Sequence, residues 1–243
     1  MGRIRKSVDF GYEIHVTNIM APMYGNHKGR SRKVKDTCKA VKKINENHSI
    51  EICEAKLKMN FRPYDWHIAL TYSDENYTED FERVKKDKRN FLTKLSRRCK
   101  KLGINLKYLT MTEKGVRSKK WHHHFVLPQE ITIALMGECW PFGQIRILNT
   151  LYANGDFSGL AKYYVDKTKG GQKEDDREKG CSHFRFSNNC TGPKVTYEAL
   201  YSYHWLKTPR APQGYYVKPG SVYEGTDPFG SYPYQKYILV RKE

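Results

Sequence analysis

Residues 106–127 read LKYLTMTEKGVRSKKWHHHFVL, and this stretch decides the expected fold. Its two ends, 106–113 and 121–127, are rich in apolar, aromatic and β-branched side chains, which is the composition of strands. The segment between them is basic, contains a glycine and favours a turn. The stretch therefore predicts a pair of neighbouring strands joined by a short connection.

Strand and helix patterns flank this pair on both sides. A strand and then a basic amphipathic helix that stops at Gly103 come before it, and a short helix, a strand and a last helix come after it. The expected ranges are 67–72, 79–102, 131–137, 144–148 and 160–169. The order strand, helix, strand, strand, helix, strand is the split β-α-β arrangement. We therefore expect an α+β fold, with a ferredoxin-like antiparallel sheet and flanking helices.

The remaining segments divide the chain into further parts. Residues 1–60 are expected to form an amino-terminal arm, with a helix from 37 to 57, and residues 61–170 the ferredoxin-like domain. Residues 171–180 are almost entirely glycine and charged residues, which favours a linker. Residues 181–243 are rich in Tyr, Pro and Gly, have weak periodicity, and are expected to form an extension packed on or near the main domain.

The charge of the chain indicates a polyanionic partner. Forty-four Lys and Arg residues against 26 Asp and Glu residues give a formal net charge of +18. Aromatic residues make up 13% of the chain, and rings among basic side chains suit single strands, whose bases can stack. Nucleic acid is therefore the expected partner. A membrane partner is not expected, because no apolar run approaches the roughly 18 residues of a spanning helix.

The cysteines and the amino terminus indicate a cellular compartment. Six cysteines are scattered without a C-x-x-C pair, so the sequence predicts neither a zinc module nor a disulfide framework. The first residues lack the apolar core of a signal peptide. We therefore expect a cytoplasmic protein with reduced thiols.

The three consecutive histidines suggest a metal site. Alternation along a strand sends His122 and His124 to one face of the sheet and His123 to the other. Glu113 ends the neighbouring strand, where hairpin geometry brings it beside these two histidines. A set of two imidazoles and one carboxylate suits Mg²⁺ or Mn²⁺ when a phosphate and waters complete the shell. We expect His122, His124 and Glu113 to bind one divalent cation.

Two adjacent tyrosines on the last helix, Tyr163 and Tyr164, are candidate nucleophiles, with Lys167 one turn further on. Adjacent helical residues point about 100° apart, so the two phenols cannot both reach one metal. Tyr164 continues the apolar stripe of Leu160 and Ala161, which favours Tyr163 as the exposed residue. A lysine three or four residues later lies on the tyrosine's side and can stabilise its charge.

In their order and spacing these elements resemble the HUH endonucleases, named for a His-hydrophobic-His motif. The similarity extends to Leu70-Thr71-Tyr72 as a first motif, to Glu113 as the third ligand, and to Trp140-Pro141-Phe142-Gly143 before a strand. The closest resemblance is to replication initiators of filamentous phages, plasmids and integrative elements, and it covers roughly residues 35 to 205.

Two positions depart from the pattern of that family. His123 stands where the family has an apolar residue. The family's Tyr-x-x-Lys spacing matches Tyr164 and Lys167, whereas the Leu-Ala-x-Tyr context selects Tyr163, so the choice of nucleophile stays open with a slight preference for Tyr163.

The resemblance implies a rolling-circle replication initiator that nicks single-stranded DNA at an origin hairpin or nick site. It implies a metal-dependent transesterification that leaves a 5′-phosphotyrosine and a free 3′-hydroxyl, with later rejoining of ends. The chain has no Walker-type phosphate loop, so a host helicase and a host polymerase are expected partners. The alternatives are a relaxase or transposase of the same superfamily, or a nucleic-acid-binding module without catalysis.

Overall fold

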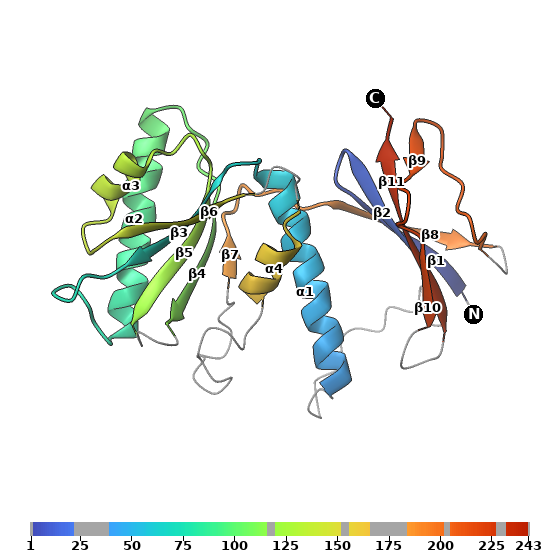
Figure 1. The fold of residues 1–243 in the computed structure, drawn as a ribbon, viewed down its shortest axis with the longest axis horizontal. Coiled ribbons are helices and arrows are strands. Elements are labelled where there is room, and N and C mark those ends of the chain that lie inside the picture. The colour runs from blue at the N-terminus through green and yellow to red at the C-terminus, as the bar shows by residue number, and fades with distance from the viewer. Residues whose placement is uncertain are drawn as a thin grey trace. The chain divides into compact units, whose positions relative to one another are not determined.

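The computed structural model describes residues 2–21, 39–115, 120–151, 156–165, 184–201, 205–226 and 232–242. The chain divides into two compact units (Figure 1). The central unit comprises residues 37–192, and the terminal unit comprises residues 1–36 together with 193–243. The linker expected over 171–180 lies outside the described residues. No helix in the described ranges is long and apolar enough to cross a membrane.

The central unit contains the predicted ferredoxin-like sheet. Its strands lie in the order β6-β3-β5-β4-β7, and every neighbouring pair is antiparallel. The elements are α1 (Lys39–Asn60), β3 (Trp66–Thr71), α2 (Phe81–Lys101), β4 (Leu109–Lys114), β5 (Trp121–Leu127), α3 (Ile133–Cys139), β6 (Ile145–Thr150), α4 (Ser158–Val165) and β7 (Phe184–Phe186). The α+β fold is thus confirmed, with the three histidines on β5 between β3 and β4.

Two apolar layers cover the two faces of this sheet. On one face Phe125 of β5 packs against Phe91 of α2, with ring centroids 5.2 Å apart, and α3 completes that layer. On the other face Val126 packs with Leu57 of α1 and Tyr164 of α4. Figure 1 shows α2 and α3 on one side of the sheet and α1 and α4 on the other. Alternation along β5 therefore assigns each histidine to one layer or the other.

Local signals fix the ends of the helices. The Asp80 carboxylate accepts a hydrogen bond from the backbone N–H of Glu82 and caps the start of α2, and Thr132 caps α3 in the same way. Gly103 follows α2 with a φ of 69°, a left-handed conformation that favours glycine. The Asp156 carboxylate accepts a hydrogen bond from the N–H of Ser158 and begins α4. The tyrosine helix therefore starts at Ser158, two residues before the predicted range of 160–169.

The turn over residues 140–143 holds β6 beside the end of β3. The Trp140 indole N–H donates to the Thr71 carbonyl oxygen at 3.0 Å, and the Ser73 N–H donates to the Phe142 carbonyl oxygen at 2.9 Å. A Cβ on Gly143 would lie 2.2 Å from the Thr71 carbonyl oxygen. Only glycine allows this approach, so the residue is required by packing.

The terminal unit is a second antiparallel sheet that the sequence did not predict. Strands from the two ends of the chain lie side by side in it, in the order β10-β11-β2-β1-β8, with β9 paired to β11 (Figure 1). Its strands are β1 (Gly2–Asp9), β2 (Glu13–Ala21), β8 (Lys194–Leu200), β9 (Tyr215–Val217), β10 (Tyr223–Thr226) and β11 (Pro233–Arg241). Helix α1, which the sequence analysis placed in an amino-terminal arm of residues 1–60, lies within the central unit.

The close approach at Gly143 predicts a cost for the smallest side chain. Gly143→Ala should lower the free energy of unfolding by about 3 kcal/mol, because the methyl group must displace the backbone of β3. The matched control is Gly137→Ala, since Gly137 lies in α3 with nothing near its Cβ position. The control should be neutral or stabilising by up to about 1 kcal/mol. Urea unfolding of both variants measures this difference, and equal effects would contradict it.

Candidate active site

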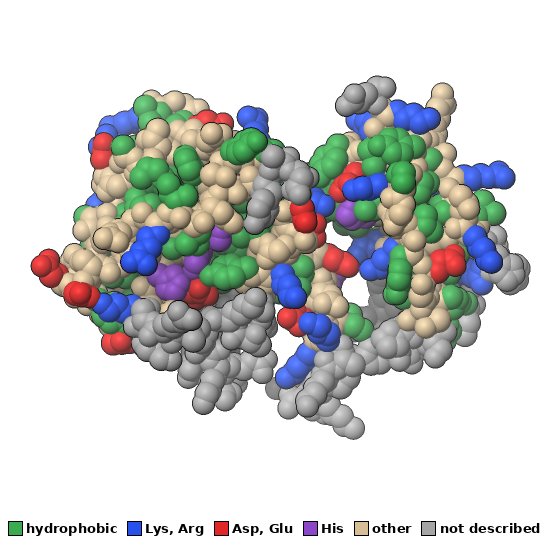
Figure 2. Space-filling model, viewed as in Figure 1, with side chains coloured by type: hydrophobic (Ala, Val, Ile, Leu, Met, Phe, Trp, Pro, Cys, Tyr) green, Lys and Arg blue, Asp and Glu red, His purple; other side chains and the backbone are tan. Residues whose placement is uncertain are grey.

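The three expected ligands converge on the face of the sheet that α1 and α4 cover. The register pairs Glu113 with His122, and His122 and His124 share one face with ring centroids 4.9 Å apart. Glu113 Oε1 lies 3.1 Å from His122 Nε2 and 2.9 Å from His124 Nε2. One ligand atom from each residue lies within 4.8 Å of the others, so the three residues could hold a metal ion. Histidine side chains reach the surface together in a recess of this unit (Figure 2).

The hydrogen bonding of His122 favours a cation at this place. His122 Nδ1 lies 3.3 Å from the Lys120 carbonyl oxygen, which can only accept, so Nδ1 carries the proton. In the tautomer with its proton on Nδ1, His122 directs the lone pair of Nε2 at the Glu113 carboxylate. Two lone pairs at this distance repel each other unless a positive charge lies between them. A histidine fixed through its outer nitrogen is the usual arrangement of a metal ligand, so the residues fit a divalent cation.

The protonation states of the ligands suit the same role. Burial by itself raises the pKa of Glu113, but the contacts with His122 and His124, with a contribution from Tyr163, outweigh burial and hold the pKa well below its ordinary value. The carboxylate is therefore charged at neutral pH. Burial lowers the pKa of His124, so its imidazole is neutral and can donate its lone pair to a cation.

The structure brings the Tyr163 hydroxyl, and not that of Tyr164, to the three ligands. The Tyr163 hydroxyl donates to Glu113 Oε1 at 2.8 Å and lies 2.9 Å from His124 Nε2. Tyr164 is 1% exposed, packs beneath α4, and its hydroxyl has no partner among the described residues. Lys167 lies outside the described residues.

The surroundings of Tyr163 keep its phenol protonated. Burial is the larger cause, and the negative charge of Glu113 acts in the same direction, so the pKa of Tyr163 is raised far above its ordinary value. A positive charge beside the phenol oxygen would oppose both effects. The phenol is therefore protonated at neutral pH, and a cation bound beside it would favour loss of its proton.

Behind the ligands lies a third histidine that the sequence analysis did not single out. His67 Nδ1 is 2.9 Å from Asn149 Oδ1, and the His67 ring lies 5.7 Å from that of His124 and 6.1 Å from that of Tyr163. Burial, with repulsion from His124, lowers the pKa of His67 to about 4. Ala69 of β3 pairs with His124 of β5, and His67 lies two residues before Ala69 on the same strand, so both point to the face of His124. The sequence alone could not show this, because it does not give the register of β3 against β5.

An open cavity of about 590 Å³ adjoins His122. Its lining includes Thr71, Gln144 and Arg146, with the Lys120–Asp74 ion pair at one side. Ala69 pairs with Arg146 on β6 and with His124 on β5, so the Arg146 side chain leaves the sheet on the same face as the ligands. A guanidinium there suits a phosphate oxygen. The sequence analysis missed Arg146 because its position depends on the pairing of β6 with β3.

His123 belongs to the opposite face, as alternation predicted. Its Nε2 lies 3.2 Å from the Tyr72 hydroxyl and its Nδ1 2.9 Å from the Thr112 hydroxyl. Lys88 Nζ donates to that same Thr112 oxygen at 2.8 Å, and the Tyr72 hydroxyl faces the Asp87 carboxylate. The buried imidazole is satisfied on both sides by this network. The network accounts for a polar residue where the resembling family has an apolar one.

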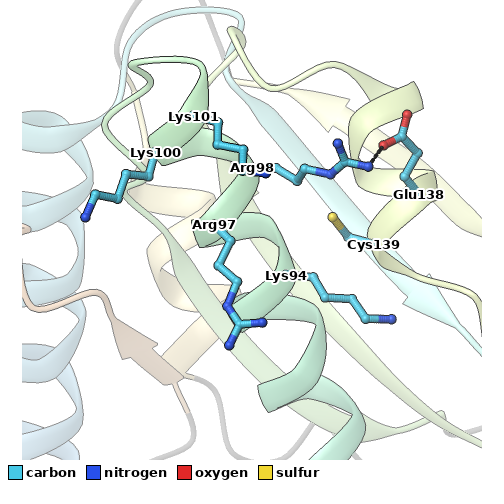
Figure 3. Close-up of a pocket in the computed structure, with 7 residues that line it drawn as sticks. All are labelled: Lys94, Arg97, Arg98, Lys100, Lys101, Glu138 and Cys139. Carbon is cyan, nitrogen blue, oxygen red and sulfur yellow. Dashed lines mark ion pairs between the residues drawn. The ribbon is translucent and has the colours of Figure 1, made fainter.

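A separate basic surface lies at the carboxyl-terminal end of α2 (Figure 3). It lines a cavity of about 700 Å³ and consists of Lys94, Arg97, Arg98, Lys100 and Lys101, with Glu138 and Cys139. Arg98 forms an ion pair of 2.8 Å with Glu138, whereas the other four basic side chains have no acidic partner among the described residues. Because α2 covers the face opposite Glu113, this surface is separate from the ligands and can attract phosphates of bound nucleic acid.

We expect one Mn²⁺ to bind per chain, because two imidazoles and a carboxylate converge on one point. Glu113→Ala, His122→Ala and His124→Ala should each weaken binding more than the about 10–100-fold loss typical of outer-shell substitutions. Titration calorimetry measures the dissociation constants. The control is His48→Ala, which removes an exposed histidine of α1 and should leave binding unchanged. Unaltered affinity in the ligand variants would exclude the site.

The burial of His67 predicts an acid-sensitive stability of the metal-free protein. The folded pKa of about 4 lies below the ordinary 6.5, so between these values the unfolded chain binds a proton that the folded chain does not. Neutral His67 therefore contributes about 3 kcal/mol to the free energy of unfolding. This contribution is fully present above pH 6.5 and is lost as the pH falls towards 4. Urea unfolding in chelator, from pH 7 to pH 4, should show a smaller pH dependence for His67→Asn. An identical slope in both proteins would refute the assignment.

One of the comparisons with known proteins found a similar family. Residues 65–169 match the family model of the replication-associated protein ORF2/G2P. The matched range begins just before β3 and extends past α4, so it contains Glu113, His122, His124 and Tyr163. No curated protein and no solved structure matches the chain. The matched part of the chain is thus similar to a family of DNA replication proteins, which is consistent with a rolling-circle replication initiator.

Proposed function

We propose that this chain is an endonuclease that starts rolling-circle replication by nicking single-stranded DNA, with Tyr163 as the nucleophile. The observation that carries the proposal is the convergence of the Tyr163 hydroxyl on Glu113 and His124 within 2.9 Å. The Tyr163 ring packs at the edge of the apolar layer, and its hydroxyl is directed at two residues that could hold a metal ion. The match of residues 65–169 to a replication-associated family supports the same reading.

The proposed reaction is a transesterification at phosphorus. The Tyr163 oxygen forms a bond with the phosphorus, the bond from phosphorus to the 3′-oxygen breaks, and the products are a 5′-phosphotyrosine and a 3′-hydroxyl. The phenol loses its proton and the departing 3′-oxygen gains one. A divalent cation at Glu113, His122 and His124 would polarise the phosphate and lower the phenol pKa. The same chemistry in reverse rejoins ends, and the free 3′-hydroxyl can prime a host polymerase after a host helicase separates the strands.

The residues of the chain have separate tasks in this scheme. Glu113 orients the phenol by accepting its hydrogen bond, but its low pKa makes it a poor base for removing the proton. Arg146, on the same face and beside the adjoining cavity, is proposed to hold a non-bridging phosphate oxygen. Tyr164 anchors α4 in the apolar layer and so fixes the direction of Tyr163.

The decisive experiment compares two phenylalanine variants on a labelled single-stranded oligonucleotide that carries the element's own origin. Tyr163→Phe should bind this DNA and form no covalent adduct with Mn²⁺ present, because the nucleophile is gone. Tyr164→Phe is the matched control. It removes a buried hydroxyl that has no partner among the described residues, so the adduct yield should stay within about twofold of wild type.

A ligand variant separates binding from cleavage in the same assay. His124→Ala should reduce adduct formation at least about 100-fold while DNA affinity changes little, because affinity rests on distributed phosphate contacts. If Tyr163→Phe still forms the adduct, Tyr163 is not the nucleophile. If wild-type protein binds the origin strand but never forms a metal-dependent adduct, the chain is a binding module instead.

A further inference from the structure

The terminal unit carries a regular row of side chains across its sheet. The strand registers pair Tyr223 with Lys236, Lys236 with Thr17, Thr17 with Lys6, and Lys6 with Tyr197. Directly paired residues on neighbouring strands point to the same face. One residue from each of β10, β11, β2, β1 and β8 therefore lies in a single line, in the order Tyr, Lys, Thr, Lys, Tyr. We call this line the tyrosine–lysine row.

The row presents two aromatic rings and the Lys236 side chain to the surface, and Lys6 is half-buried. Tyr223 is 58% exposed and Tyr197 is 52% exposed, and Lys236 between them is also exposed. Four strand spacings separate the two tyrosines, which is about 19 Å. Lys236 Nζ also lies 5.9 Å from the ring of Tyr234, and that ring is 6.0 Å from the ring of Tyr223. One end of the row thus holds two neighbouring aromatic rings beside a cation.

The apolar cluster of the terminal unit lies on the other face of the same sheet. Val16 and Tyr237 are paired with each other and are buried there with Leu239. On that face Asn18 donates to Gln235, which in turn donates to the carbonyl oxygen of Leu206. Neither row tyrosine belongs to this apolar cluster, and both rings keep more than half of their surface exposed, in register with lysines.

We propose that the tyrosine–lysine row binds single-stranded DNA, with bases stacked on the tyrosine rings and phosphates on Lys6 and Lys236. The choice of DNA rests on the proposed function. Residues 1–36 and 193–243 hold 15 Lys and Arg residues against 7 Asp and Glu residues, so the unit complements a polyanion. A single strand is the fitting form, because its base faces are free to stack whereas those of a duplex are not. The row lies outside the matched residues 65–169.

The test measures DNA binding by the full chain in the presence of chelator, so that no cleavage takes place. Fluorescence anisotropy compares a labelled single-stranded oligothymidine with a random-sequence duplex of the same length. The double variant Tyr197→Leu with Tyr223→Leu should weaken single-strand binding about tenfold or more, because leucine offers no flat ring. The corresponding pair of phenylalanine substitutions keeps both rings and should stay within about twofold of wild type. Duplex affinity should change little in either variant.

The lysines give a second, independent readout. Replacing both Lys6 and Lys236 by glutamine should reduce the slope of log affinity against log salt by about 0.7 for each phosphate contact that is lost. The control pair is Lys207→Gln with Lys218→Gln, which removes the same charge from the same unit away from the row. Tyr12→Leu is the control for the tyrosines, since Tyr12 is 50% exposed and lies outside the row. Thermal unfolding checks that each variant folds.

The proposal is overturned if the leucine pair binds the single strand like wild type, if duplex binding falls equally, or if Tyr12→Leu has the same effect. These outcomes are independent of the cleavage chemistry. If the row variants bind single-stranded DNA normally and the wild type forms a covalent adduct, only the proposal that the row binds DNA is contradicted. If the row variants lose single-strand binding and the wild type forms no adduct, only the proposed nicking by Tyr163 is contradicted.

Discussion

One carboxylate oxygen, Glu113 Oε1, accepts the contacts on which the candidate site depends. Two imidazoles and a phenol approach this single atom within 3.1 Å, from β5 and from α4. The arrangement exists only in one register of β4 against β5, because a slip of one residue would turn Glu113 to the other face. The apolar layers under α2 and under α1 and α4 fix that register, since each layer accepts only alternate residues of β5. The chemistry of the site is therefore a consequence of how the sheet is packed.

The two tyrosines of α4 show how packing assigns roles to identical side chains. Tyr164 is buried in the layer with Leu57 and Val126, and this contact orients the helix. Its neighbour then points about 100° away, towards the ligands. His123 and His124 divide in the same manner on β5: His123 joins the hydrogen-bond network with Tyr72 and Thr112, and His124 faces the site. In each pair one residue, Tyr164 or His123, packs within its layer of the fold. Its neighbour, Tyr163 or His124, is thereby directed towards the candidate site.

The two units differ in how they use aromatic and basic residues. In the central unit most rings lie in the apolar layers, and four basic side chains without an acidic partner among the described residues gather at the end of α2. In the terminal unit several tyrosines stand exposed, and two of them are in register with lysines across the sheet. Charge and aromatic content alone indicate nucleic acid for the whole chain. The basic surface at the end of α2 offers cations that suit phosphates. The strand registers of the terminal sheet place tyrosine rings in line with lysines, and such a surface suits bases as well as phosphates.

The sequence by itself determined the order of elements in the central unit and the shared face of His122 and His124, because periods of 2 and 3.6 residues are local properties. It also indicated Glu113, since a hairpin makes its strand the neighbour of the histidine strand. It left Tyr163 and Tyr164 open, because helical phase and the Tyr-x-x-Lys spacing disagreed and only the docking of α4 sets the direction of each phenol. His67, Arg146 and the terminal sheet required the tertiary structure. Their positions depend on pairing between strands distant in sequence, and such pairing leaves no periodic signal in either strand alone.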